Sequence, residues 1–177
     1  MVCARGSREE FEAKRRHSQA VKRTMAEYRK SPQHLFWMEL VNRVYDHGFD
    51  SVSPQEQYYF AVGVLHGEVL NGGFHQFFSN SSGDHYLPAE RGLEVLGAKR
   101  ALEILRNAKE LVFASSAVPA WEARNARLDE LEGNEAINAA LRVLDDEFVV
   151  EDEALWVLLA KYAVDNGFYP PPTGSAS

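Results

Sequence analysis

The chain has 177 residues, a formal net charge of −7 and a single cysteine, Cys3. That length suffices for one domain with its own apolar core, and one thiol can form neither an internal disulfide nor a zinc cluster. We therefore expect a cytoplasmic protein, and the lack of a long apolar run leads us to expect neither secretion nor a membrane contact.

The N-terminal segment differs from the rest of the chain in charge. Residues 1–30 carry nine Lys/Arg and four Glu, a net charge of +5, whereas the other 147 residues carry ten Lys/Arg and 22 acids, a net charge of −12. We expect residues 1–30 to form a basic helical arm with a thin apolar stripe of Phe11, Ser18, Val21, Met25 and Tyr28. Its basic clusters, Lys14-Arg15-Arg16 and Lys22-Arg23, fit either an exposed helix or a nonspecific phosphate contact.

Two helix starts follow the arm. Ser31-Pro32 predicts a helix up to Gly48, with Leu35, Met38, Val41, Val44 and Tyr45 on its buried face. Ser53-Pro54 predicts a second helix that runs to about Leu70, and this signal is stronger because Glu56 stands in the capping-box position.

Helical spacing continues to the end of the domain, and strand-like alternation is nearly absent. Further helices are expected from Leu87-Pro88 to Gly97 and over 98–113, 120–131, 134–147 and 151–166. Their buried faces are expected to hold Leu102, Leu105, Ala108, Leu111, Val112, Ile137, Ala140, Leu141, Leu144, Leu155, Leu158, Leu159 and Tyr162. The sequence predicts an all-α fold, a single globular domain of seven or eight helices over 31–168, with a disordered tail over 169–177.

A pair of glycines, Gly72 and Gly73, interrupts the second helix. Glycine accepts positive φ without steric cost, and Phe74, Phe77 and Phe78 recur at i, i+3 and i+4 behind it. One interpretation is a helix corner at 71–74 that the aromatic side chains anchor in the core. The alternative is a ligand pocket built on Asn71, Gln76 and Asn80.

The same stretch resembles a known family. The run EVLNGGFHQFFSNSSG, residues 68–83, and LEVLGAKRALEIL, from residue 93, resemble the signature of the bacterial DNA-mimic protein family over roughly 33–168. The resemblance implies an all-helical protein whose carboxylates imitate DNA phosphates, so that it occupies the DNA-binding surface of a transcription factor or histone-like protein. The matching positions are Glu68, Asn71, Gly72, Gly73, Phe74, Gln76, Phe77, Phe78, Asn80 and Gly83, which are not the imitating charges.

Acidic residues are densest near the C-terminus, where only Arg142 opposes them between 129 and 153. They are Asp129, Glu130, Glu132, Glu135, Asp145, Asp146, Glu147, Glu151, Asp152 and Glu153. On one straight helix they would stand about 3.7 Å apart on average, close to the spacing of roughly 3.4 Å along one DNA strand. A second acidic row would have to come from Glu94, Glu103 and Glu110 or from a symmetric second copy in a homodimer. The alternative is that the acids are solvated helix faces and helix starts.

Catalysis has little support in the sequence. Folding could gather His66, Glu68, His75 and His85, but no HExxH or comparable spacing is present, and GxSxG and phosphate-loop motifs are absent. We expect no metal and no cofactor. Glu68 is expected to be a partly buried carboxylate that hydrogen-bonds amides at the glycine corner.

Our leading hypothesis is a non-enzymatic protein whose ten clustered acids bind a basic DNA-binding protein, without direct contact to nucleic acid. The runner-up is a small hydrolase or ligand-binding domain that uses Glu68, Asn71, His75, Gln76, Asn80 and His85 around the glycine corner. A third reading, neutralisation of a basic toxin, uses the same acidic surface as the first.

Overall fold

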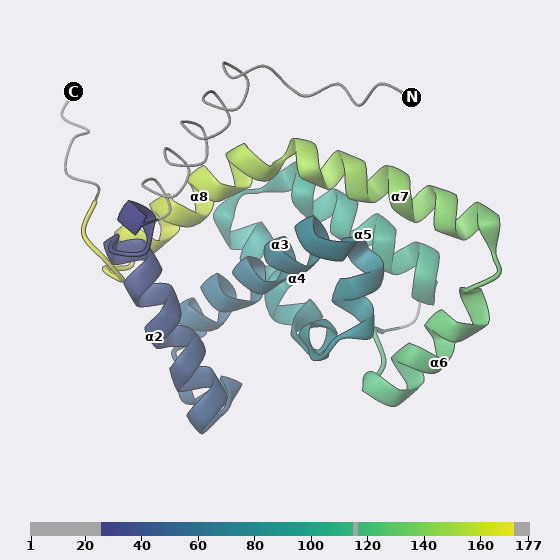
Figure 1. Ribbon diagram of the computed structural model, residues 1–177, viewed down its shortest axis with the longest axis horizontal. Helices are drawn as coiled ribbons and strands as arrows, with labels where there is room; N and C mark the ends of the chain where they lie inside the picture. The colour runs from purple at the N-terminus through teal and green to yellow at the C-terminus, as the bar shows by residue number, and fades with distance from the viewer. Residues whose placement is uncertain (1–25, 115–116, 172–177) are drawn as a thin grey trace, which may run out of the picture.

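A computed structural model describes residues 26–114 and 117–171 of the protein (Figure 1). Its α-helices are α2 Pro32–His47, α3 Pro54–Ser79, α4 Tyr86–Leu96, α5 Lys99–Phe113, α6 Trp121–Leu131, α7 Glu135–Val150 and α8 Asp152–Asp165. Residues 26–28 are also helical, and the described ranges contain two short 3-10 helices, η1 Phe49–Ser51 and η2 Ser81–His85, and no strand. The predicted all-α single globular domain is confirmed.

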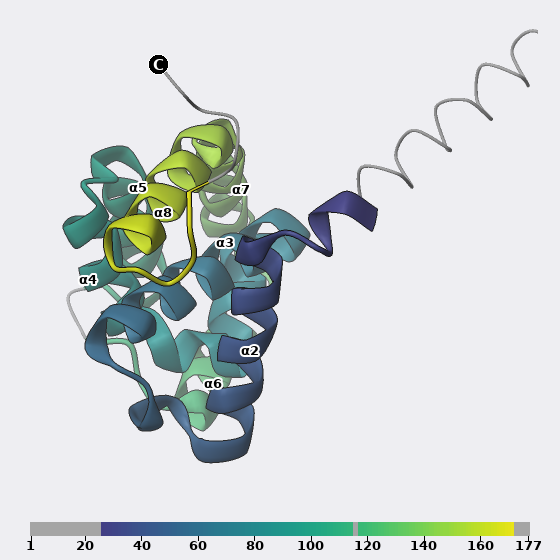
Figure 2. The same ribbon diagram turned by 90° about the vertical axis from the view of Figure 1, so that its left-hand side faces the viewer.

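Helix α3 forms the centre of the domain, and α2, α4, α6, α7 and α8 all pack against it. The buried face of α3 includes Leu65, Phe74, Phe77 and Phe78, each with no exposed surface. α7 and α8 lie end to end as an arch along one edge of the molecule, and α6 descends from the far end of α7 (Figure 1). α2 lies at the other end of the molecule from α6 (Figure 1), and the turned view shows it running down beside α3 (Figure 2).

Both predicted helix starts are confirmed. The Ser31 hydroxyl accepts a hydrogen bond from the His34 backbone N–H at 3.1 Å. Ser53 and Glu56 form the expected capping box, in which the Ser53 backbone N–H donates to the Glu56 carboxylate at 2.9 Å. These contacts satisfy N–H groups that have no partner within the helix.

The predicted buried face of α2 is partly wrong. Leu35, Met38 and Tyr45 are 58%, 44% and 89% exposed. Val41 and Val44 do pack against the core as predicted, and the rest of the buried face is formed by Phe36, Trp37 and Leu40. Trp37 sets this rotation, because a Cβ on Gly63 would lie only 2.7 Å from the indole, so the ring occupies space that only glycine leaves free. The faces predicted for α5, α7 and α8 do line the core, except that Ala140 lies outside the core cluster.

The described chain stays packed slightly beyond the predicted end of the domain at residue 168. Phe168 stacks on Phe36 with ring centroids 4.8 Å apart, and Tyr169 is only 8% exposed. The rest of the predicted tail, from residue 172, lies outside the described residues, as does most of the predicted arm, residues 1–25. In the described ranges, no helix is both long and apolar enough to cross a membrane.

Candidate functional site

The glycine corner divides α3 into two helical segments. Gly73 takes φ 73° and ψ −176°, a combination that is essentially restricted to glycine. The chain therefore turns between Asn71 and Phe74, and the three phenylalanines that follow are fully buried. The interpretation as a helix corner anchored by aromatic side chains is confirmed.

The polar residues of the corner bind one another across the turn. Glu68 accepts hydrogen bonds from the Gln76 side-chain amide at 2.6 Å and from the Asn80 amide at 3.0 Å. The Asn71 amide in turn donates to the Gln76 carbonyl oxygen at 3.2 Å. Glu68 is thus the amide-bonded, partly buried carboxylate that the sequence predicts, and the side chains of the alternative pocket hold the corner together instead.

Asp145 closes the corner from α7. Its carboxylate accepts a hydrogen bond from the Phe74 backbone N–H at 2.7 Å, and a Cβ on Gly73 would lie 2.7 Å from its Cγ. Burial raises the pKa of Asp145, and the Phe74 N–H opposes this rise because it stabilises the carboxylate. One of the ten acids predicted to bind a partner is therefore engaged inside the molecule.

Arg124 secures the C-terminal end of α3. The side chain has no exposed surface, and its guanidinium donates to the carbonyl oxygens of Phe78 at 2.6 Å and Asn80 at 3.0 Å. It also pairs with Asp84 at 2.8 Å. Gly83 is required beside it, because a Cβ there would lie 2.6 Å from Nε. Arg124 is not among the predicted site residues, although its spacing to Leu128 and Leu131 is that of a buried helix face.

A cavity of about 340 Å³ opens beside the corner, between α3, α6 and α7. His75 is the one residue of the runner-up set that lines it, together with Gly72, Leu128, Leu131, Glu132, Asn138, Leu141, Arg142 and Asp145. The side chains of Glu68, Gln76 and Asn80 are bonded to one another, so they do not converge on this space.

His66 and His85, the other histidines considered for a metal site, lie in separate environments. His66 lies with Nε2 2.5 Å from a carboxylate oxygen of Asp152. His85 packs between Phe49 and Phe60, at ring-centroid distances of 4.4 and 5.4 Å, and this burial lowers its pKa. Among the described residues, no group of three or more His, Cys, Asp or Glu side chains could hold a metal ion.

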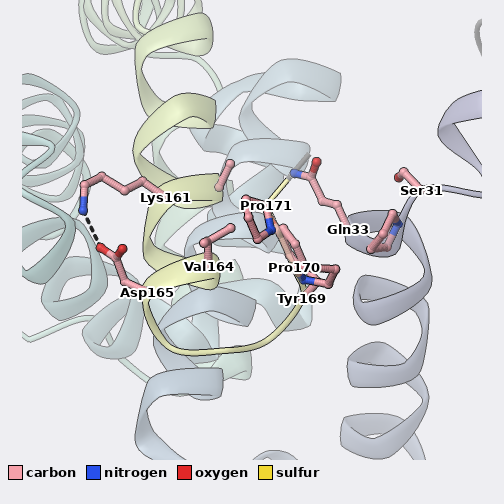
Figure 3. A pocket seen from close by; sticks show the side chains of 10 residues that line it. Ser31, Gln33, Lys161, Val164, Asp165, Tyr169, Pro170 and Pro171 are labelled. Carbon is pink, nitrogen blue, oxygen red and sulfur yellow. Dashed lines mark hydrogen bonds and ion pairs between the residues drawn. The ribbon is translucent and has the colours of Figure 1, made fainter. Parts of the chain in front are cut away.

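A larger cavity, of about 480 Å³, lies between the start of α2 and the last turns of α8 (Figure 3). Its wall is mainly apolar, with Val164, Tyr169, Pro170 and Pro171 on one side and the Lys161–Asp165 ion pair at the edge. None of the predicted site residues reaches it.

Three more of the ten acids have partners on neighbouring helices or within their own helix. Glu130 pairs with Arg127 at 2.8 Å, Glu147 pairs with Arg100 at 2.8 Å, and Asp152 contacts His66. The acids suggested for a second row are also paired: Glu94 with Arg91, Glu103 with Arg100 and Glu110 with Lys109.

The remaining six acids form no ion pair with any described residue; they are Asp129, Glu132, Glu135, Asp146, Glu151 and Glu153. Glu135 and Asp146 are exposed and lie 11 residues apart on α7, which places them on one face of that helix, and Glu153 is exposed in the first turn of α8. We call these three residues the outer acidic row. It runs along the outside of the α7–α8 arch, over about 27 Å.

The acids do not lie on one straight helix. α6 ends at Leu131, α7 begins at Glu135, and a one-residue break at Glu151 separates α7 from α8. Asp129 therefore lies in the last turn of α6 and Glu132 directly after that helix, so neither belongs to the arch.

Comparison with known proteins identifies the family of the chain. The family model described as DMP19-like protein matches residues 50–166, which is more than half of the chain and spans α3 to α8. Searches of curated proteins and of solved structures found no match. The matched region contains the glycine corner, the buried Arg124 and all ten acids. The chain belongs to the DMP19-like family.

Proposed function

We propose that this protein is a non-enzymatic DNA mimic that presents the acidic outside of the α7–α8 arch to the DNA-binding surface of a basic protein. The supporting observation is the outer acidic row, whose three carboxylates face solvent without a cationic partner in the described chain. The family match supports the same function, because the family takes its description from a DNA-mimic protein.

The charge density limits what one copy can imitate. Four of the acids without an ion pair lie on the arch, Glu135, Asp146, Glu151 and Glu153, and they span about 27 Å at helical rise, or roughly one charge per 7 Å. One DNA strand carries a charge about every 3.4 Å. A single protein therefore offers about half the charge density of one strand, and a second copy is the remaining source of a second row.

The partner class follows from this surface. A transcription factor or a histone-like protein binds phosphates through Lys and Arg, and the same side chains would bind the outer acidic row. The encounter takes place in the cytoplasm in this proposal, with no cofactor and no direct contact between this protein and nucleic acid. A basic toxin is a further possible target of the same surface.

The ligand-binding alternative loses its main support. Its amide and carboxylate groups bond to one another at the corner, and the half-buried His85 packs between aromatic rings. A catalytic pocket requires polar groups that converge on open space.

A competition experiment tests the proposal. Immobilised protein is incubated with bacterial lysate at low salt, the bound basic proteins are identified, and each purified partner is then challenged with duplex DNA. We expect the duplex to displace the partner, because both ligands use the same cationic side chains. A partner that binds the duplex and this protein simultaneously would contradict mimicry.

A further inference from the structure

Arg142 is the only basic residue in the acidic stretch 129–153, and it forms no ion pair with any described residue. Asp145 and Asp146 follow it by three and four residues, the spacing at which ion pairs form on a helix. Arg142 instead lines the cavity of about 340 Å³ between α3, α6 and α7. A guanidinium always carries its charge, and an anionic group is the partner that it binds best.

Acceptor groups outside the Glu68 network line the same cavity. The Asn138 amide donates to the Glu132 backbone carbonyl at 2.9 Å, which leaves Asn138 Oδ1 without a hydrogen bond in the described chain. The Glu132 carboxylate forms no ion pair there either, and Asp145 uses only one carboxylate oxygen for the Phe74 N–H. An ammonium group donates three hydrogen bonds, and these three side chains can each accept one.

The rest of the cavity wall is apolar. Leu128, Leu131 and Leu141 line it and are 4%, 7% and 5% exposed. They belong to the core of the domain, so this wall is in place before a ligand binds. The volume of about 340 Å³ lies near the lower end of the range for small-molecule sites, roughly 300–1,000 Å³. The cavity therefore suits a small molecule with an apolar group.

The signs of the charges in the cavity select the class of ligand. A simple anion would meet the carboxylates of Glu132 and Asp145, and a simple cation would meet the guanidinium of Arg142. A molecule that carries both charges can pair with all three groups. His75 lines the same cavity and can donate a further hydrogen bond to the negative end of such a molecule.

We propose that this cavity binds an α-amino acid with an apolar side chain. The ligand carboxylate pairs with Arg142 and His75. The ligand ammonium group donates to Glu132, Asn138 and Asp145, and its side chain packs against the three leucines. The site is separate from the outer acidic row, so the proposal stands independently of the proposed function.

Titration of the full chain with L-leucine, followed by the backbone amide signals in NMR spectra, tests the site. We expect saturable shifts centred on the residues that line the cavity. Two analogues serve as comparisons: 4-methylpentanoate, which lacks the ammonium group, and 3-methylbutan-1-amine, which lacks the carboxylate. Each should bind about 10-fold more weakly or worse, because it leaves a charged group of the cavity without its partner.

Substitutions in the protein test the same contacts. Arg142→Gln and Glu132→Gln change exposed side chains, so both variants should fold, and each should weaken L-leucine binding about 10-fold or more. Arg91→Gln and Glu122→Gln, at exposed positions of α4 and α6, make the same changes of charge and should leave the affinity unchanged.

The absence of saturable shifts up to about 20 mM L-leucine would overturn the proposal. So would an analogue that binds as tightly as L-leucine, or an affinity that Arg142→Gln leaves unchanged.

Discussion

At Gly73 a single backbone conformation determines the path of the central helix. The combination of φ 73° and ψ −176° costs other residues about 1–3 kcal/mol, and an added Cβ would also displace Asp145. Gly73→Ala should therefore lower the free energy of unfolding by about 2 kcal/mol or more, measured by urea denaturation.

Gly67→Ala is the matched control for Gly73→Ala. Gly67 lies within the same helix, is exposed and has nothing within 4 Å of an added Cβ. Alanine there should raise stability by about 0.5–1 kcal/mol, since it reduces the entropy lost on helix formation. If the two variants lost equal stability, the strain would not reside in the corner.

Asp145 makes the same corner sensitive to pH. Because burial raises its pKa in the folded protein, the folded state binds the proton more tightly than the unfolded state does. Stability from this group is therefore present below its unfolded pKa and is lost as pH rises through the raised folded pKa. His75, Arg142 and Asp146 are the charged or titratable neighbours that modify this titration.

Asp145→Asn keeps an oxygen acceptor for the Phe74 N–H but cannot ionise. We expect the variant to gain stability relative to the wild type as pH rises from the ordinary pKa of an Asp carboxyl, about 3.9, through the raised pKa of Asp145 in the folded protein. Urea denaturation at a series of pH values measures the difference. A difference that shrinks over this range would show that the carboxylate charge stabilises the corner, contrary to our account. Asp145→Leu, which also loses the acceptor, should cost about 1–3 kcal/mol at every pH.

At the scale of elements, Arg124 joins α6 to the end of α3. Its planar guanidinium serves Phe78, Asn80 and Asp84 in different directions, a geometry that an ammonium group cannot reproduce. Arg124→Lys should therefore destabilise the domain almost as much as Arg124→Met, by about 3 kcal/mol or more in chemical denaturation. Arg127→Lys, at a half-exposed ion pair on the same helix, should cost under about 1 kcal/mol. If Arg124→Lys lost little stability, the positive charge alone would account for the contact between α6 and the end of α3.

The two faces of α2 differ in their contribution to stability. Leu40 is fully buried, so Leu40→Ala should cost about 2–5 kcal/mol in the free energy of unfolding. Leu35 is 58% exposed, so Leu35→Ala should change stability by less than about 0.5 kcal/mol. If both variants lost comparable stability, Leu35 would contribute to the core, as the sequence predicted.

The comparison of α2 with α5 explains which faces are predictable from sequence. In α5 the apolar residues occupy one stripe, so the helix has one orientation that buries them. α2 is apolar on several sides, and only the space that Gly63 leaves for Trp37 selects the buried side. Helix starts and the glycine corner depend on neighbouring residues, and they were predictable for that reason.

The contacts of the candidate site also divide into local ones, which the sequence predicts, and long-range ones, which it does not. The Glu68 contacts join residues within 12 positions of one another, and the sequence predicted their type. The roles of Asp145 and Arg124 depend on contacts 71 and 46 residues away, which local patterns do not specify. Charge density along the chain also did not reveal that α5 and α6 supply arginines to two of the ten acids.

At the scale of the whole molecule, the arch concentrates carboxylates that lack a cationic partner in the described chain on one side. Electrostatic attraction to a basic partner falls as salt shortens the screening length, so the affinity should fall steeply with ionic strength. Neutralising the outer acidic row should remove most of this dependence.

The most direct test measures the affinity of the captured basic partner from about 50 to about 300 mM salt. The wild type is compared with Glu135→Gln/Asp146→Asn/Glu153→Gln and with Glu39→Gln/Asp46→Asn/Asp50→Asn, a control with the same change of net charge on α2 and η1. We predict that the wild type and the control bind with the same steep salt dependence, and that the row variant binds weakly with a shallow one. Equal weakening by the two triple variants, or an affinity indifferent to salt, would contradict the account.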